Sequence, residues 1–138
     1  MDILNIPFNR LIGLEISDAP EYLMVLPAKG EYENHLQTVH ASALFALAEA
    51  SSGLCLLQEF SDLANVVPVV RNVEVKFRKP GRGTICSKAF LNVDKAAVLE
   101  TLDTKHRALI PVQVTLHDAN GVFIMQATFE WFVLINAN

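Results

Sequence analysis

The sequence is poor in residues that cross-link a fold. It contains only two cysteines, Cys55 and Cys86, among 138 residues, and they form no CxxC or CxxH pattern. Neither they nor the four histidines show the spacing of metal ligands, so no metal site is predicted. A chain of this length can bury roughly two-thirds of its unfolded surface without such aids. We therefore expect one domain over residues 1–138, with buried free thiols and no metal.

An excess of basic residues and a membrane-spanning run are also missing. The chain has 11 basic and 15 acidic residues and a net charge of −4, which argues against a nucleic-acid partner. No apolar run approaches the ~20 residues that span a membrane. Residues 1–5 lack the basic start and apolar core of a signal peptide. We therefore expect a cytoplasmic protein with no membrane partner.

The apolar residues that are present predict one long helix over about 40–59. This stretch has no Pro, Val or Ile, and Thr38 is a candidate N-cap. Its leucines have helical spacing, and small residues stand on most other sides. Small residues allow neighbouring strands to approach the helix closely, so we expect a sheet to wrap around it.

Strand patterns occupy most of the remaining chain. Asp94 is a candidate N-cap for a second helix at about 94–104, and Asp118 to Gly121 is a hairpin signal. The predicted elements are a short helix (3–11), a strand pair (12–17 and 22–28), and strands at about 69–78, 84–93, 112–116 and 122–135. One long helix against an antiparallel sheet is an α+β architecture.

Glu49 is the candidate catalytic residue. It is the only charged residue between His40 and Gln58, and its neighbours are apolar or small. Partial burial would raise the pKa of its carboxyl, which suits a general base working near neutral pH. The alternative is that Glu49 faces solvent or makes a buried polar contact.

The start of the long helix supplies a second set of groups. Backbone N–H groups in the first helical turn have no intrahelical partner, so those of Ala41 and Ser42 can hold a developing oxyanion. His40 and Glu49 are nine residues apart, about two and a half turns, and so lie on opposite helix faces. One chain cannot easily aim both at the same atom, whereas two chains related by a two-fold axis can. We therefore expect a homodimer, or a tetramer built from dimers.

This segment resembles the signature of the PaaI-type hotdog thioesterases. That signature runs Asn, a short loop, His-Gly-Gly, then a helix with Leu-Ala-Asp or Leu-Ala-Glu. Here Asn34 is followed six residues later by His40, and Glu49 comes nine residues after His40. Arg78-Lys79-Pro80-Gly81 resembles the family's Arg-Pro-Gly turn, and the order of elements matches across nearly the whole chain.

The resemblance implies a hotdog fold and hydrolysis of an acyl-CoA thioester at a dimer interface. Glu49 would activate water or attack directly, and Asn34 would position the water or the substrate. His40 and the Ala41 backbone N–H would polarise the thioester carbonyl. Coenzyme A enters as part of the substrate, and no separate cofactor is implied. The sequence departs from the family where Ala41-Ser42 replaces the double glycine, and where Gln37 stands at a frequent glycine position.

Four basic residues are weaker candidates for substrate binding. Arg71 lies on the apolar phase of its strand, from which it can reach the site or extend from the sheet edge to solvent. Arg78, Lys79 and Arg82 can meet the CoA phosphates or form a plain solvated turn.

Two other functions remain open. A hotdog dehydratase or hydratase also uses His and an acid, but the His-Phe-Pro-Gly loop of the dehydratases is absent here. A hotdog dimer can also bind an acyl-CoA without cleaving it, and the loss of both glycines keeps that alternative open.

Overall fold

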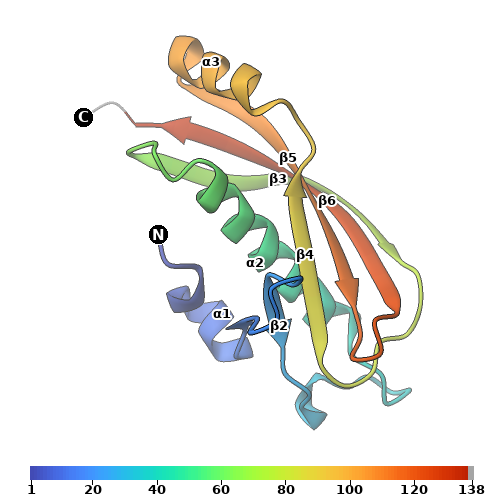
Figure 1. The fold of residues 1–138 in the computed structure, drawn as a ribbon. Coiled ribbons are helices and arrows are strands. Elements are labelled where there is room, and N and C mark those ends of the chain that lie inside the picture. Colours follow the sequence, from blue (N-terminus) through green and yellow to red (C-terminus); the bar gives the residue numbers. More distant parts are fainter. Residues whose placement is uncertain (137–138) are drawn as a thin grey trace.

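The structure is a computed structural model, and it describes residues 1–136. One long helix, α2 (Ala41–Glu59), packs against a six-stranded antiparallel sheet whose strand order is β1-β2-β4-β5-β6-β3 (Figure 1). The strands are β1 (Glu15–Ile16), β2 (Met24–Leu26), β3 (Val66–Phe77), β4 (Ile85–Leu91), β5 (Arg107–His117) and β6 (Phe123–Ile135). The predicted α+β architecture is therefore confirmed.

Helix α2 is held close to the sheet through small side chains. Ala48, Ser51 and Ser52 are buried against the strands. The Ser51 hydroxyl donates to Leu47 O at 2.7 Å and lies 2.6 Å from the hydroxyl of Ser87 on β4. Helix α2 is long and apolar enough to cross a membrane. However, 61% of the stretch of α2 that meets this criterion is buried inside the protein. The apolar side chains of α2 therefore form part of the hydrophobic core.

The N-cap of α2 is His40 and not Thr38. The His40 ring accepts a hydrogen bond from the Ser42 N–H on Nδ1, whereas the Thr38 hydroxyl is bonded to the side chain of Asn34. The prediction of Thr38 was wrong because a competing local contact occupies its side chain.

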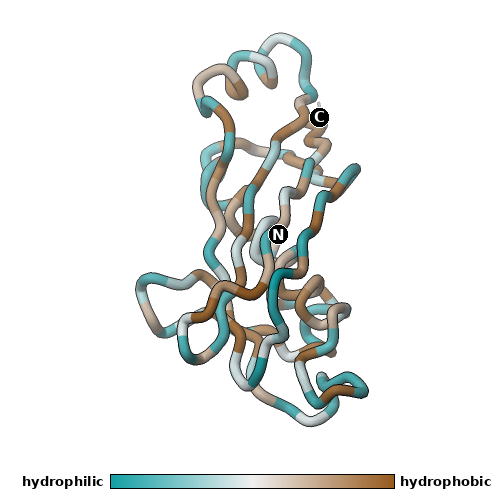
Figure 2. The backbone as a smooth tube through the Cα atoms, turned by 90° about the vertical axis from the view of Figure 1, so that its right-hand side faces the viewer, coloured by the Kyte–Doolittle hydropathy of each residue, from teal (hydrophilic) through white to brown (hydrophobic). Residues whose placement is uncertain are grey.

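Besides α2, residues 1–136 contain four shorter helical segments. A 3₁₀ turn, η1 (Ile3–Asn5), and α1 (Pro7–Ile12) lie beside α2, and a second 3₁₀ turn, η2 (Gly30–Tyr32), precedes it. The second predicted helix is present as α3 (Lys95–Lys105), and Asp94 caps it by accepting from the Ala96 N–H. Helix α3 lies at one end of the sheet in both views, and Figure 2 also shows hydropathy alternating along the long strands.

A β-bulge in β3 changes which residues face α2. The pairing with β6 shifts between Val70 and Asn72, so Val70 and Val73 both lie opposite inward-facing residues of β6. Arg71 sits at the bulge, exposed, with its guanidinium 5.5 Å from the ring centre of Phe132 on the outer face. The strict alternation that placed Arg71 on the apolar phase was wrong because the extra residue reverses the phase there.

Strand β3 forms one edge of the sheet. Within residues 1–136 it pairs only with β6, so the opposite side of this 12-residue strand carries unpaired backbone groups. Exposed apolar residues lie along it, with 53% of Val69 and 37% of Val67 accessible. A long edge strand of this kind is a template for pairing with another chain.

Candidate active site

Glu49 lies half-buried on the side of α2 that faces β3. It lines a cavity of about 330 Å³ between α2, the N-terminal segment and the edge of the sheet. The other lining residues are almost all apolar: Met1, Ile3, Ile6, Asn9, Ala50, Gly53, Leu57, Pro68, Val69, Val70 and Trp131. Burial raises the pKa of the Glu49 carboxyl above its ordinary value. Within residues 1–136 no hydrogen bond or ion pair reaches this carboxylate, so it remains available to a ligand.

The helical turn that carries Glu49 is anchored to the sheet. The Ser52 hydroxyl donates to Glu49 O at 2.7 Å, and the indole N–H of Trp131 on β6 donates to the Ser52 hydroxyl at 3.0 Å. This chain fixes the backbone of Glu49 relative to β6. Trp131 is buried, and a buried indole N–H usually finds an acceptor, which here is the Ser52 hydroxyl.

The start of α2 presents two hydrogen-bond donors. Because His40 Nδ1 accepts from the Ser42 N–H at 2.9 Å, the neutral ring carries its proton on Nε2. The Ala41 N–H has no acceptor among residues 1–136. Of the two predicted oxyanion donors, Ala41 is therefore free and Ser42 is already engaged.

The replaced glycines have different consequences. Ala41 and Ser42 form the first turn of α2 and have ordinary negative φ, so this backbone needs no glycine. Gln37 has φ of 59°, the left-handed conformation that glycine adopts most easily. The sequence departure at Gln37 therefore places a side chain in a strained backbone position, while that at Ala41 does not.

Asn34 organises the loop before α2. Its side-chain oxygen accepts from the backbone N–H groups of Leu36 and Thr38, and its amide donates to the Thr38 hydroxyl at 2.9 Å. These bonds hold the loop that leads into His40. The role of Asn34 toward water or substrate stays a prediction.

The basic turn after β3 docks against that same loop. Gly81 O accepts from the Val39 N–H at 2.9 Å, and Arg82 donates to Gln37 O at 3.4 Å. A Cβ on Gly81 would lie 2.5 Å from Cδ1 of Ile124, so a larger residue here requires the Ile124 side chain to move. Arg78 and Lys79 are exposed in the same turn, and the Arg78 guanidinium lies 4.8 Å from the ring centre of Phe123.

The predicted residues therefore form two groups within one chain. His40, Ala41, Ser42, Asn34 and Arg82 gather around the start of α2, whereas Glu49 lines the cavity farther along the helix. Arg71 lies apart from both on the outer face of the sheet. In the part of the chain that the structure describes, no group of three or more His, Cys, Asp or Glu side chains is placed to hold a metal ion.

Solved structures with the same architecture are numerous. A Pseudomonas aeruginosa protein of unknown function, described as a probable thioesterase, superposes with a TM-score of 0.80 at 27% identity, covering 97% of this chain and 91% of its own. A Bacillus halodurans protein crystallised with CoA gives 0.66 at 20% identity, covering 80% of this chain and 70% of its own. The E. coli PaaI protein, from the phenylacetic acid degradation operon, gives 0.64 at 15% identity, covering 88% of this chain and 84% of its own.

These likenesses confirm the hotdog fold and the resemblance to PaaI-type proteins that the sequence predicted. No curated protein matches the chain. A family model does match, over residues 5–133, which is nearly the whole sequence. The chain therefore belongs to the family described as a domain of unknown function (DUF4442), and its fold is the one shared with hotdog proteins described as thioesterases.

Proposed function

We propose that this protein is an acyl-CoA thioesterase that uses Glu49 as general base or nucleophile. The observation that carries the proposal is a half-buried carboxylate on the central helix, which has no partner within residues 1–136 and lines an otherwise nearly apolar cavity. Structural relatives described as thioesterases, and one crystallised with CoA, support the same reaction class.

Glu49 suits either route of thioester hydrolysis. As a general base, its carboxylate takes a proton from water while the water oxygen bonds to the thioester carbonyl carbon. The carbon–sulfur bond then breaks, the CoA thiolate recovers the proton from Glu49, and a carboxylic acid and free CoA result. As a nucleophile, Glu49 displaces the thiolate to form an anhydride, which water hydrolyses to the same products.

The start of α2 supplies the complementary groups. The free Ala41 N–H and the Nε2–H of His40 are donors for the oxygen on which negative charge develops. The partial positive charge at this end of the helix acts in the same direction.

We place each site between two copies of the chain. Within one chain Glu49 and the start of α2 belong to separate groups, and the edge of β3 is open for pairing with a second chain. An isologous dimer would bring the helix start of one protomer to Glu49 of the other, and would generate two equal sites.

A second candidate function is binding of an acyl-CoA without cleavage. One observation favours it: the Ser42 N–H is bonded to His40, so of the two expected backbone donors only the Ala41 N–H is free among the described residues 1–136. Because losing a single such donor costs about a hundredfold or more in rate, the remaining arrangement can be too weak for turnover.

Thiol release distinguishes the two functions. The protein is incubated with acyl-CoAs from acetyl to palmitoyl and a thiol reagent, beside a Glu49→Gln variant. We expect release to fall at least about a hundredfold in the variant, the scale of a lost general base. Glu59→Gln is the matched control, because Glu59 is on the same helix but exposed and paired with Lys95 at 3.7 Å. Binding without release would favour the non-catalytic module, and release unchanged by Glu49→Gln would remove Glu49 from the mechanism.

A further inference from the structure

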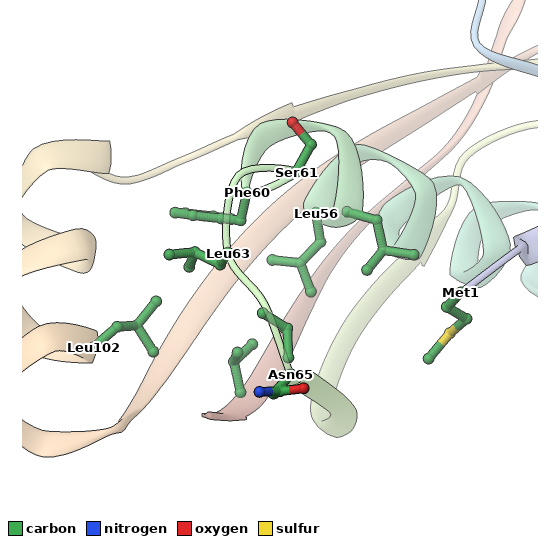
Figure 3. A pocket seen from close by; sticks show the side chains of 10 residues that line it. Met1, Leu56, Phe60, Ser61, Leu63, Asn65 and Leu102 are labelled. Carbon is green, nitrogen blue, oxygen red and sulfur yellow. The ribbon is translucent and has the colours of Figure 1, made fainter. Parts of the chain in front are cut away.

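A second cavity continues the Glu49 cavity along α2. It has a volume of about 310 Å³ and lies between the end of α2, residues 60–65, the start of β3 and α3 (Figure 3). Its lining residues are Met1, Leu56, Leu57, Phe60, Ser61, Leu63, Asn65, Val66, Leu102 and Val133. Met1 and Leu57 line both cavities, so the two spaces adjoin.

The residues of α2 that line the two cavities follow one face of the helix. Ala50, Gly53, Leu57 and Phe60 are spaced by three, four and three residues, which places them in a single row. From Glu49 to Phe60 this row is about 16 Å long at ~1.5 Å per residue. The row begins with the smallest side chains, and a Cβ on Gly53 would already lie 3.3 Å from Ile3 and Trp131. The space beside Glu49 therefore depends on these small residues.

Most side chains that line the second cavity are apolar, as contact with an alkyl chain requires. None of its lining side chains is charged, and Leu56, Phe60 and Leu102 are buried. Ser61 and Asn65 are the exposed, polar residues of the lining. In Figure 3 the side chains of Met1 and Leu102 lie at opposite sides of the space, and Leu102 comes from α3. Helix α3 thus forms the far wall.

The first cavity alone is large enough for a small acyl group. A volume of 330 Å³ holds on the order of ten water-sized groups, which accommodates a short or aromatic acyl group. Only a longer acyl chain, one that extends past Leu57, would therefore enter the second cavity.

We infer that the two cavities form one channel for a saturated acyl chain of about ten to twelve carbons. The inference rests on the proposed function, since it places the thioester carbonyl beside Glu49. An extended chain advances roughly 1.3 Å per carbon, because C–C bonds of about 1.5 Å zigzag at tetrahedral angles. A row of about 16 Å therefore spans about twelve carbons. Carbons beyond that length extend past the row and gain no further burial along it.

The test is a binding titration with the Glu49→Gln protein, so that little substrate is consumed. Straight-chain acyl-CoAs from two to sixteen carbons are titrated by calorimetry. Each buried methylene is expected to tighten binding roughly fourfold. The dissociation constant is expected to fall with chain length up to about ten to twelve carbons and then to stay level.

A bulky side chain placed between the two cavities provides a second test of the channel. Leu57→Trp, made in the Glu49→Gln protein, is expected to end the gain at no more than about nine carbons, because Leu57 lies eight residues, or about 12 Å, along the row from Glu49. Leu54→Trp is the matched control, because Leu54 is a half-buried leucine of the same helix that lines neither cavity. It is expected to keep the original profile.

The outcomes separate the two proposals. No binding of any CoA thioester would overturn the proposed function and this inference together. Binding that gains nothing beyond about four carbons, or that keeps tightening to sixteen, would overturn the channel alone. The same shift with Leu54→Trp as with Leu57→Trp would also overturn it. The chain-length series on the Glu49→Gln protein remains decisive if Leu57→Trp does not fold.

Discussion

The indole N–H of Trp131 donates a 3.0 Å hydrogen bond to the hydroxyl of Ser52, and that hydroxyl donates to the carbonyl of Glu49. Trp131→Phe removes the donor and leaves the Ser52 oxygen without it, so we expect the free energy of unfolding to fall by about 1–3 kcal/mol. Urea denaturation measures this loss. A Trp131→Phe, Ser52→Ala double variant should lose less than the sum of the two single changes, because the pair no longer exists to be broken. Strict additivity would show that the bond contributes nothing.

The burial of Glu49 predicts that ionisation of its carboxyl lowers the stability of the fold. Its pKa is raised by burial, so the folded state binds the Glu49 proton more tightly than the unfolded state. The stability from this group is fully present below the unfolded pKa and is lost as pH rises through the folded pKa. Glu49→Gln, which cannot ionise, should therefore melt at a higher temperature than the parent protein at pH 7. Below about pH 4, near the ordinary Glu pKa, the difference should vanish. A melting temperature at pH 7 that is lower in the variant would contradict a raised pKa.

The left-handed backbone of Gln37 predicts a stabilising glycine. Gln37→Gly relieves the cost of holding a side chain at φ of 59°, so we expect a gain of about 0.5–1 kcal/mol in the free energy of unfolding. The bond from Arg82 to Gln37 uses a backbone carbonyl and survives the change. Chemical denaturation measures the gain. Glu33→Gly is the control: Glu33 has φ of −80° and ψ of 149°, which any residue adopts, so glycine there should destabilise. Equal effects at the two positions would refute the assignment of strain to Gln37.

The open edge of β3 predicts how the protein associates. We expect light scattering at micromolar concentration to give a dimer, or a multiple of it. Val67→Lys places a charge on the exposed edge, away from the residues that line either cavity, and should shift the protein toward monomer, with thioesterase activity falling in parallel. Leu109→Lys is a matched control, since Leu109 is similarly exposed, at 46%, but lies on β5 inside the sheet. A monomeric parent protein with full activity would show that the site needs no second chain.

The fold was predictable from the sequence where a local pattern decides the structure. The small residues of α2 and the Asp94 cap of α3 are signals carried by a few neighbouring residues, and both helices are present where they were expected. The phase of β3 around Arg71 was not predictable, because a bulge is set by how two strands pair along their length. The cap at His40 was missed for a different reason, because the Thr38 hydroxyl is held by the side chain of Asn34, four residues earlier.

The site was predictable only in part. The burial of Glu49 follows from its apolar neighbours, and the exposed start of α2 follows from the helix itself. The hydrogen bond between Trp131 and Ser52 joins residues far apart in the sequence, and no short-range pattern predicts it. The same holds for the second cavity, whose walls combine the end of α2 with Val133 and with Leu102 of the additional helix.

The central claim, that each site takes Glu49 from one chain and the start of α2 from the other, is tested most directly by subunit complementation. Glu49→Gln and His40→Ala proteins are prepared separately, unfolded together in equal amounts and refolded. In a mixed dimer one site combines the intact His40 of the first chain with the intact Glu49 of the second, and the other site carries both defects. Since about half of the dimers are mixed and each has one intact site, we predict recovery of about a quarter of the parent activity. If the mixture is no more active than the two variants assayed alone, the sites lie within single chains and the account is wrong.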